Sequence, residues 1–447
     1  MSSKAIEQRF VPILTTAFIV ILAFMPDYDA FVGDIAKTQS LLTLITGVPQ
    51  ELVLKHADKI IFALSVIVGG CALIHSLRYK LLRWVGMISI AICAYGVSRL
   101  LFTGINLKEA LSPRNAAFLN IFLIACATAA AGKYLSIRRG LITGVIVSAA
   151  TKLVYSFYIY MKVGGVEIFK GVAMFAADGG ILALWGVAAL WCFASALNNL
   201  EMRRRLISIL WIGLMIVFVV AIGASFRRNI MFRLVGTLGL TTILGGFLYR
   251  RTFKALIVAS VAACFGGALL VATLFAVFGA ETAVDRIGSV SHSSDSNFSS
   301  SNLSYEDDWR ALPATIVKHH GLGVGPGQSY GITRVVEELV DENGTIPLHT
   351  GSYELMASFG IIGLTYQLLV LIFIPIYAIR RGRAAMSRPD MLLAASVASL
   401  LWLGLWPFGP PFYVNTAATV LVGMQLGIVC GELDLEGTSA DNNYAAA

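Results

Sequence analysis

Charged residues are scarce in this sequence. They make up 13% of the 447 residues, whereas an ordinary soluble domain has roughly 25%. Hydrophobic residues make up 57%. This composition excludes an ordinary soluble fold and indicates that the chain is solvated by lipid.

Cysteine is also rare, and no CxxC pair occurs. The six cysteines are Cys71, Cys93, Cys126, Cys192, Cys264 and Cys430. All lie within or at the ends of apolar stretches, which is typical of packing residues rather than of redox pairs or metal ligands. The first apolar segment lacks a small-x-small cleavage site and is followed by Pro26 and Asp27. We therefore expect a retained helix there and not a removed signal peptide.

Long apolar runs are what the sequence does have. Runs of about 17 to 25 residues recur along the chain, each long enough to cross a hydrocarbon core as a helix. They lie near 10–26, 60–77, 84–103, 116–131, 140–161, 171–197, 206–225, 229–249, 255–279, 352–379, 391–408 and 411–430. The expected fold class is all-α, a polytopic membrane protein of about twelve transmembrane helices.

The net charge of +8 is explained by clusters of Lys and Arg between apolar runs. The clusters fall at 78–83, 133–139, 203–205, 250–254 and 380–388. Basic residues concentrate in cytoplasmic loops of membrane proteins, so these clusters predict that both termini face the cytoplasm. The basic excess is then a sorting signal, and no nucleic-acid partner is expected.

Four parts follow from this pattern. Residues 1–280 form transmembrane helices one to nine with short loops, and 281–351 form one large outer loop. Residues 352–430 form helices ten to twelve, and 431–447 form a cytoplasmic tail that we expect to be disordered. Within the loop, two short helices joined by a glycine-rich segment, Gly321–Gly327, are expected to form a cap over the bundle. The glycine-rich segment lacks the context of a dinucleotide site and is interpreted as a turn.

His349 is the candidate general base. It stands just before the span that begins near Ser352, so the positive end of the helix dipole disfavours the imidazolium form. A neutral ring at the membrane surface can accept a proton from a sugar hydroxyl. The alternative is an interfacial histidine that only caps the loop.

Arg227 and Arg228 fall in the short turn between the seventh and eighth spans, on the same outer side as His349 by parity. Positive charge on that side is no sorting signal, so it indicates an anionic partner, and guanidinium groups bind phosphate oxygens bidentately. The alternative is an anchor to lipid headgroups.

Three further charges lie inside apolar spans towards their outer ends: Arg99, Lys152 and Asp178. Intramembrane charges are costly, so Lys152 and Asp178 are expected to pair with each other or to line a polar cavity that binds substrate. Asp27 and Asp29 form a DxD triplet that could hold a divalent cation. Such triplets are common by chance, and no metal site is assigned.

An ordered set of motifs is found on the outer side of these spans. It begins with Trp309-Arg310-Ala311-Leu312 and continues with Gly321-Leu-Gly-Val-Gly-Pro-Gly327, and then come His349 and Phe359-Gly-Ile-Ile-Gly363. This pattern resembles the O-antigen ligase family, membrane glycosyltransferases that include O-antigen ligases and O-antigen or exopolysaccharide polymerases. The resemblance implies a GT-C-like fold with a helical periplasmic cap, in the bacterial inner membrane. It also implies an inverting, metal-independent transfer that needs no cofactor.

The family's roles can be carried over to matching positions. The donor would be a glycan on undecaprenyl pyrophosphate, and His349 would be the base on the acceptor hydroxyl. The segment Ser225-Phe-Arg-Arg228 resembles the family's Ser-Arg turn, whose arginine contacts the donor pyrophosphate. Where the family usually has a second arginine, before the loop tryptophan, this chain has Tyr305, so Arg310 or Arg286 would take its place.

The function expected first is ligation of a finished glycan to lipid A core. A polymerase of the same family, with the growing glycan as acceptor, would use the same residues and stays open. A lipid-linked glycan flippase or secondary transporter is the alternative of another class, and Arg99, Lys152 and Asp178 would form its intramembrane site.

Overall fold

The computed structural model describes residues 79–102, 117–133, 135–163, 166–168, 171–173, 179–225, 228–248, 319–326, 351–385, 391–405 and 416–445, with isolated positions among 47–74 and 261–317. The expected spans at 10–26, 60–77 and 255–279 lie wholly or mostly outside the described residues. The same holds for the expected helices of the outer loop.

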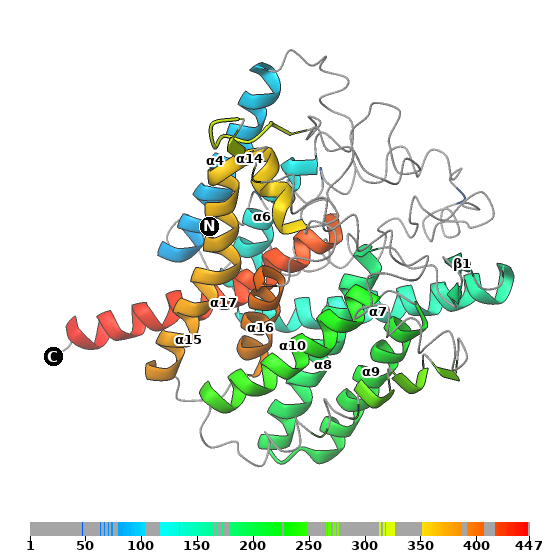
Figure 1. The fold of residues 1–447 in the computed structure, drawn as a ribbon. Coiled ribbons are helices and arrows are strands. Elements are labelled where there is room, and N and C mark those ends of the chain that lie inside the picture. The colour runs from blue at the N-terminus through cyan, green and yellow to red at the C-terminus, as the bar shows by residue number, and fades with distance from the viewer. Residues whose placement is uncertain are drawn as a thin grey trace.

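The described part of the chain is almost entirely helical (Figure 1). Its helices are α4 (Lys80–Phe102), α6 (Asn120–Lys133), α7 (Leu135–Val163), α8 (Gly179–Glu201), α9 (Arg205–Ala224), α10 (Arg228–Leu248), α14 (Gly351–Leu368), α15 (Ile374–Ala385), α16 (Met391–Leu405) and α17 (Thr416–Ala445). A 3-10 turn, η2 (Ala117–Leu119), precedes α6, and a π-helical turn, η4 (Leu369–Phe373), joins α14 to α15.

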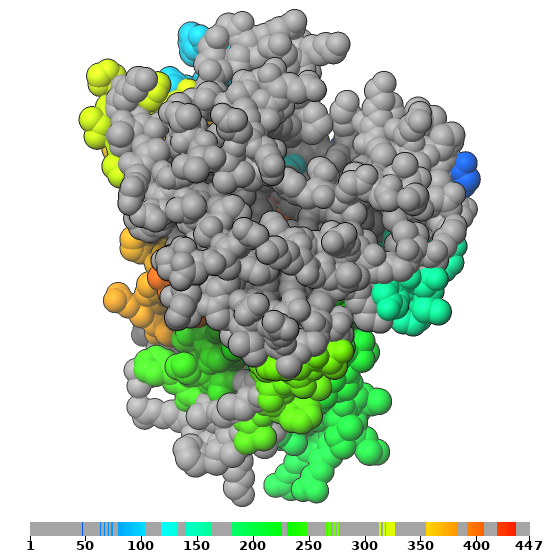
Figure 2. All heavy atoms as spheres, turned by 45° about the vertical axis from the view of Figure 1, so that its right-hand side comes forward, coloured from blue at the N-terminus to red at the C-terminus, as the bar shows by residue number. Residues whose placement is uncertain are grey.

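Among the residues that the structure describes, five helical stretches are long and apolar enough to cross a membrane. They are Lys80–Phe102, Ile181–Glu201, Arg205–Ala224, Ile230–Phe247 and Leu355–Arg381. Helix α9 also exposes large apolar side chains, with Leu206 80% and Leu210 69% exposed. Green side chains, the colour of the α8 to α10 region, lie at the lower surface in Figure 2. Such a surface is unfavourable in water and favourable in lipid, so a multi-pass membrane protein is suggested.

The structure corrects the start of the sixth span, which was expected at residue 171. A short antiparallel hairpin occupies this region, with β1 (Val166–Ile168) paired to β2 (Gly171–Ala173). Its register places Val166 opposite Ala173. Val166, Ile168 and Val172 are β-branched, which favours strands over helix, and α8 begins only at Gly179.

The C-terminal segment 431–447 was expected to be a disordered tail. In the structure, α17 continues to Ala445. A contact at the start of this segment explains why helix is favoured there: Asp434 accepts hydrogen bonds from the backbone amides of Leu81 (3.1 Å) and Leu82 (3.2 Å). Those amides belong to the first turn of α4, which has no intrahelical partners for them.

Three contacts join helix ends that the basic clusters predict to lie on the same side of the membrane. The Asp434 contact brings the end of α17 to the start of α4, and both were expected on the cytoplasmic side. Asn198, near the end of α8, accepts a hydrogen bond from the amide of Met391 at the start of α16 (3.0 Å). Ser208 at the start of α9 donates to the carbonyl of Ala196 (2.8 Å). Each contact therefore joins ends that were expected to share a side.

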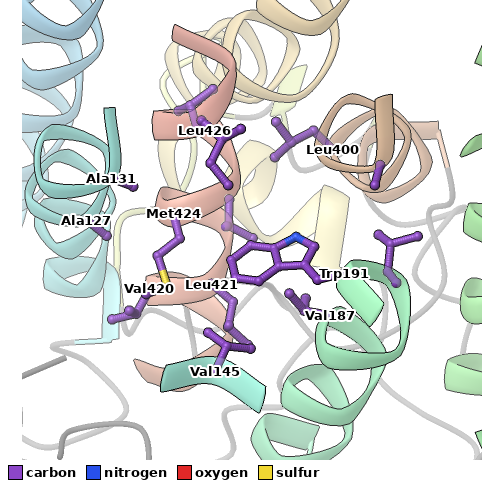
Figure 3. Close-up of a cluster of buried hydrophobic side chains, with 14 of the residues drawn as sticks. Ala127, Ala131, Val145, Val187, Trp191, Leu400, Val420, Leu421, Met424 and Leu426 are labelled. Atoms are coloured by element: carbon purple, nitrogen blue, oxygen red, sulfur yellow. The ribbon is translucent and has the colours of Figure 1, made fainter. Parts of the chain in front are cut away.

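The core of the bundle is apolar and lies between α6, α8, α16 and α17. Figure 3 shows the indole of Trp191 on α8 beside Leu421 and Met424 of α17, with Leu400 of α16 nearby. All of these side chains are buried. Helices α6 and α17 approach closely at Gly427, where a Cβ atom would lie 2.5 Å from the carbonyl oxygen of Thr128.

Candidate functional site

The best-defined polar cluster lies where the C-terminal end of α4 meets α14 (Figure 1). Between them runs the segment 319–326, here called the glycine turn. The hydroxyl of Tyr95 donates a hydrogen bond to the carbonyl of Leu322 (3.2 Å). The Nη2 atom of Arg99 donates to the carbonyl of Gly323 (3.0 Å) and lies 3.4 Å from that of Val324. The glycine turn is thereby attached to α4 through its own backbone.

Helix α14 is broken at Gly360, whose φ of 61° and ψ of −140° are not helical. The break separates residues 351–359, here called the half-helix, from the rest of α14. Without the break, the carbonyl of Ala357 would accept a hydrogen bond from the amide of Ile361, as in any α-helix. Backbone groups freed in this way must find other partners in lipid.

The glycine turn supplies those partners. The amide of Val324 donates to the carbonyl of Ala357 (2.9 Å), and the amide of Gly325 donates to that of Ser358 (3.0 Å). In return, the amide of Ile361 donates to the carbonyl of Gly321 (2.9 Å). The turn thus caps both sides of the break.

This contact between two backbones requires glycine on both sides. Gly323 has a φ of +73°, and a Cβ atom on it would lie 2.6 Å from the carbonyl oxygen of Ala357. A Cβ atom on Gly360 would overlap the carbonyl oxygen of Gly321. The glycines of Gly321-Leu-Gly-Val-Gly therefore serve close packing. The interpretation of this segment as a turn is confirmed, because the Val324 and Gly325 amides are already used.

Aromatic rings hold the half-helix from a second side. The ring of Phe359, at its last residue, lies 6.1 Å from that of Tyr95 and 5.9 Å from that of Phe118, measured between centroids. Phe359 is fully buried. Gly96 makes room for this group, since a Cβ atom there would lie 2.5 Å from the ring of Phe118. Edge-to-face and tilted aromatic pairs at such distances are favourable.

Arg99 is the predicted site residue that the structure brings into this cluster. Its side chain is half-buried. Its Nε atom is buried and has no hydrogen-bond partner in the part of the chain that the structure describes. Its positive charge is compensated by carbonyl dipoles of the glycine turn.

Of the other predicted site residues, two lie in described helices and the rest lie outside the described residues. Arg228 is the first residue of α10, directly after the turn in which the buried Ser225 donates a hydrogen bond to the carbonyl of Ile222 (2.6 Å). Lys152 lies within α7, and its side chain is fully buried. The predicted residues His349, Arg227, Arg286, Arg310 and Asp178 lie outside the described residues. In sequence, His349 stands two positions before the start of α14 at Gly351.

Two members of the cluster were missed by reasoning from sequence. Tyr95 stands four residues before Arg99, a spacing that places both on one side of a helix, and this signal could have found it. The break at Gly360 has no comparable signal, because the surrounding Phe359-Gly-Ile-Ile-Gly363 is uniformly apolar.

No family model matches this chain, and no curated protein matches it in sequence. Functional inference therefore depends on the residues and on their arrangement.

Proposed function

We propose that the chain is a membrane glycosyltransferase of the O-antigen ligase type. It would move a glycan from undecaprenyl pyrophosphate to a sugar hydroxyl of lipid A core at the periplasmic face of the bacterial inner membrane. The observation that carries this proposal is the docking of the glycine turn onto the helix that follows His349. This contact brings two of the ordered motifs, the glycine-rich segment and Phe359–Gly363, together at one end of the bundle.

The reaction needs a base and an anion site. The imidazole of His349 accepts the proton of the acceptor hydroxyl as its oxygen attacks the anomeric carbon. The bond between that carbon and the pyrophosphate oxygen breaks, and the configuration inverts. Undecaprenyl pyrophosphate leaves with the bonding electrons, and a guanidinium group stabilises its charge. Neither a metal nor a cofactor is part of this scheme.

The start of α10 supports the anion site. Arg228 is the first residue of this 21-residue helix, where the helix dipole is positive and backbone amides are unpaired. A cation is unfavourable there unless an anion is bound, whereas a pyrophosphate would benefit from both the amides and the side chain. Either Arg227 or Arg228 would make the contact.

A complementation experiment tests this function. A deletion strain would carry wild type, His349→Ala or Arg228→Ala, with His292→Ala in the same outer loop as matched control. If the chain is a ligase, His349→Ala removes the long lipopolysaccharide ladder while full-length lipid-linked glycan accumulates. Cores bearing one repeat would instead indicate the polymerase alternative. A normal ladder from well-expressed His349→Ala would refute the assignment of the base.

Burial of Lys152 favours a second candidate, a lipid-linked glycan flippase or transporter. A fully buried lysine in an apolar helix is costly and is often part of a transport path. This alternative predicts that Lys152→Met abolishes function while His349→Ala does not. The proposed enzyme predicts that His349→Ala alone abolishes transfer by purified protein in detergent, where no translocation is needed.

A further inference from the structure

We propose that Arg99 is a positioning residue that fixes the half-helix 351–359, which follows His349 in the sequence, by holding the glycine turn. The catalytic part of this inference rests on the proposed function, in which His349 is the base. The mechanical part, that Arg99 holds the half-helix, stands on contacts alone.

The half-helix needs external support because the break at Gly360 interrupts its hydrogen bonding to the rest of α14. A continuous helix would transmit its orientation through consecutive backbone hydrogen bonds. Here the register between the two parts is set instead by three hydrogen bonds to the glycine turn, at Ala357, Ser358 and Ile361. A shift of the glycine turn would therefore shift the half-helix, whose first residue follows His349 by two positions in the sequence.

The glycine turn is in turn held by α4. Arg99 and Tyr95 bind the carbonyls of three successive turn residues, 322 to 324. Helix α4 is itself fixed against the unbroken part of α14, because the hydroxyls of Ser89 and Tyr366 form a buried hydrogen bond of 2.9 Å. Helix α4 thus contacts the unbroken part of α14 through Ser89, and it holds the half-helix both through the glycine turn and through the ring of Tyr95 against Phe359.

The environment of Arg99 favours this role over direct binding of substrate. Its Nη2 atom already donates to the carbonyls of the glycine turn, so this part of the guanidinium group is engaged by protein backbone. Replacing Arg99 by methionine would leave the carbonyls of Gly323 and Val324 without these donors. Lysine could restore one donor and the charge but not the planar fork.

Amide hydrogen exchange of the purified protein in detergent tests the mechanical part. Arg99→Met should speed exchange at 323–325 and 355–361 by about tenfold or more, the factor for losing one hydrogen bond to a charged group. Arg99→Lys should restore part of the protection, and Tyr95→Phe, which removes only the bond to Leu322, should loosen the same segments less. Leu101→Ala is the control, since this side chain is 72% exposed at the same end of α4. Unchanged exchange in Arg99→Met would overturn the proposal, whatever the result for Tyr95→Phe.

Steady-state kinetics on the same preparations test the catalytic part. Positioning predicts that Arg99→Met lowers kcat by about tenfold or more while KM for the lipid-linked donor stays within about twofold, with partial recovery in Arg99→Lys. A raised donor KM at unchanged kcat would instead show that Arg99 binds substrate and would overturn the inference. If wild type transfers no glycan but Arg99→Met speeds exchange, the proposed function fails while the support of the half-helix by Arg99 stands.

Discussion

Gly360 is the residue on which the contact between the glycine turn and α14 depends most directly. Its φ of 61° and ψ of −140° lie where residues with a Cβ atom are strained. A Cβ atom on Gly360 would also overlap the carbonyl oxygen of Gly321. A side chain here would disturb both its own backbone and the docked turn.

We therefore expect Gly360→Ala to lower the thermal unfolding midpoint in detergent. The strained backbone alone costs about 1–3 kcal/mol, and displacement of the glycine turn adds to that. Heating followed by size-exclusion chromatography would measure the midpoint. Gly186→Ala is the matched control, because Gly186 lies in a helix with open space around it, where alanine is neutral or favourable. Equal midpoints for the two variants would contradict the role given to Gly360.

Helices α6 and α17 are the element pair whose packing depends on small residues. Gly423 and Gly427 stand one turn apart on α17, and the carbonyl oxygen of Gly423 accepts a hydrogen bond from Thr128 of α6 (3.1 Å). Small residues four apart allow such close approach of membrane helices. Added volume at Gly427 would force the two backbones apart.

Gly427→Val should accordingly destabilise the fold by about 1–3 kcal/mol, the usual cost of overpacking. The expected readout is a lower unfolding midpoint and less protein recovered from the membrane. Gly213→Val on α9 is the control for valine in an apolar helix, since a Cβ atom on Gly213 would meet no neighbouring helix within 4 Å among the described residues. If the two valine variants unfold at the same temperature, the close contact between α6 and α17 is not limiting.

The elements that sequence predicted best are those fixed by length and apolar content alone. The spans expected at 206–225 and 229–249 correspond to α9 and α10, each with ends one residue away. The break in α14 and the hairpin at 166–173 could not be predicted in this way, because they depend on tertiary contacts and on backbone geometry. A hydropathy profile depends only on composition. One glycine at position 360 changes the mean hydropathy of its span very little, so the profile does not reveal the break in the helix.

The site was predictable to a similar extent. The glycine-rich sequence of 321–327 predicts a turn. It does not predict that this turn docks on the break in α14. The sequence shows that a charged guanidinium group inside an apolar span is costly. It does not show the partners of Arg99, because these are backbone carbonyls and not side chains.

For the whole molecule, the alternation of basic clusters predicts which ends face the cytoplasm. Phe102 at the end of α4 is 87% exposed, and Met202 after α8 is 55% exposed. In a cysteine-free background, Phe102→Cys should react with a membrane-impermeant maleimide added to intact spheroplasts, and Met202→Cys only after lysis. Labelling of Met202→Cys in intact spheroplasts would contradict the orientation and with it the periplasmic location of the proposed site.

The proposed role of His349 as the base of a glycan transfer can be measured with purified protein. Purified wild type and His349→Ala would be given a glycan linked to undecaprenyl pyrophosphate and lipid A core as acceptor, with donor binding measured separately. Loss of a general base predicts a fall in kcat of about 10²–10⁴-fold with donor affinity retained. If His349→Ala turns over within about twofold of wild type, far from the loss expected for a general base, then His349 is not the base of the transfer.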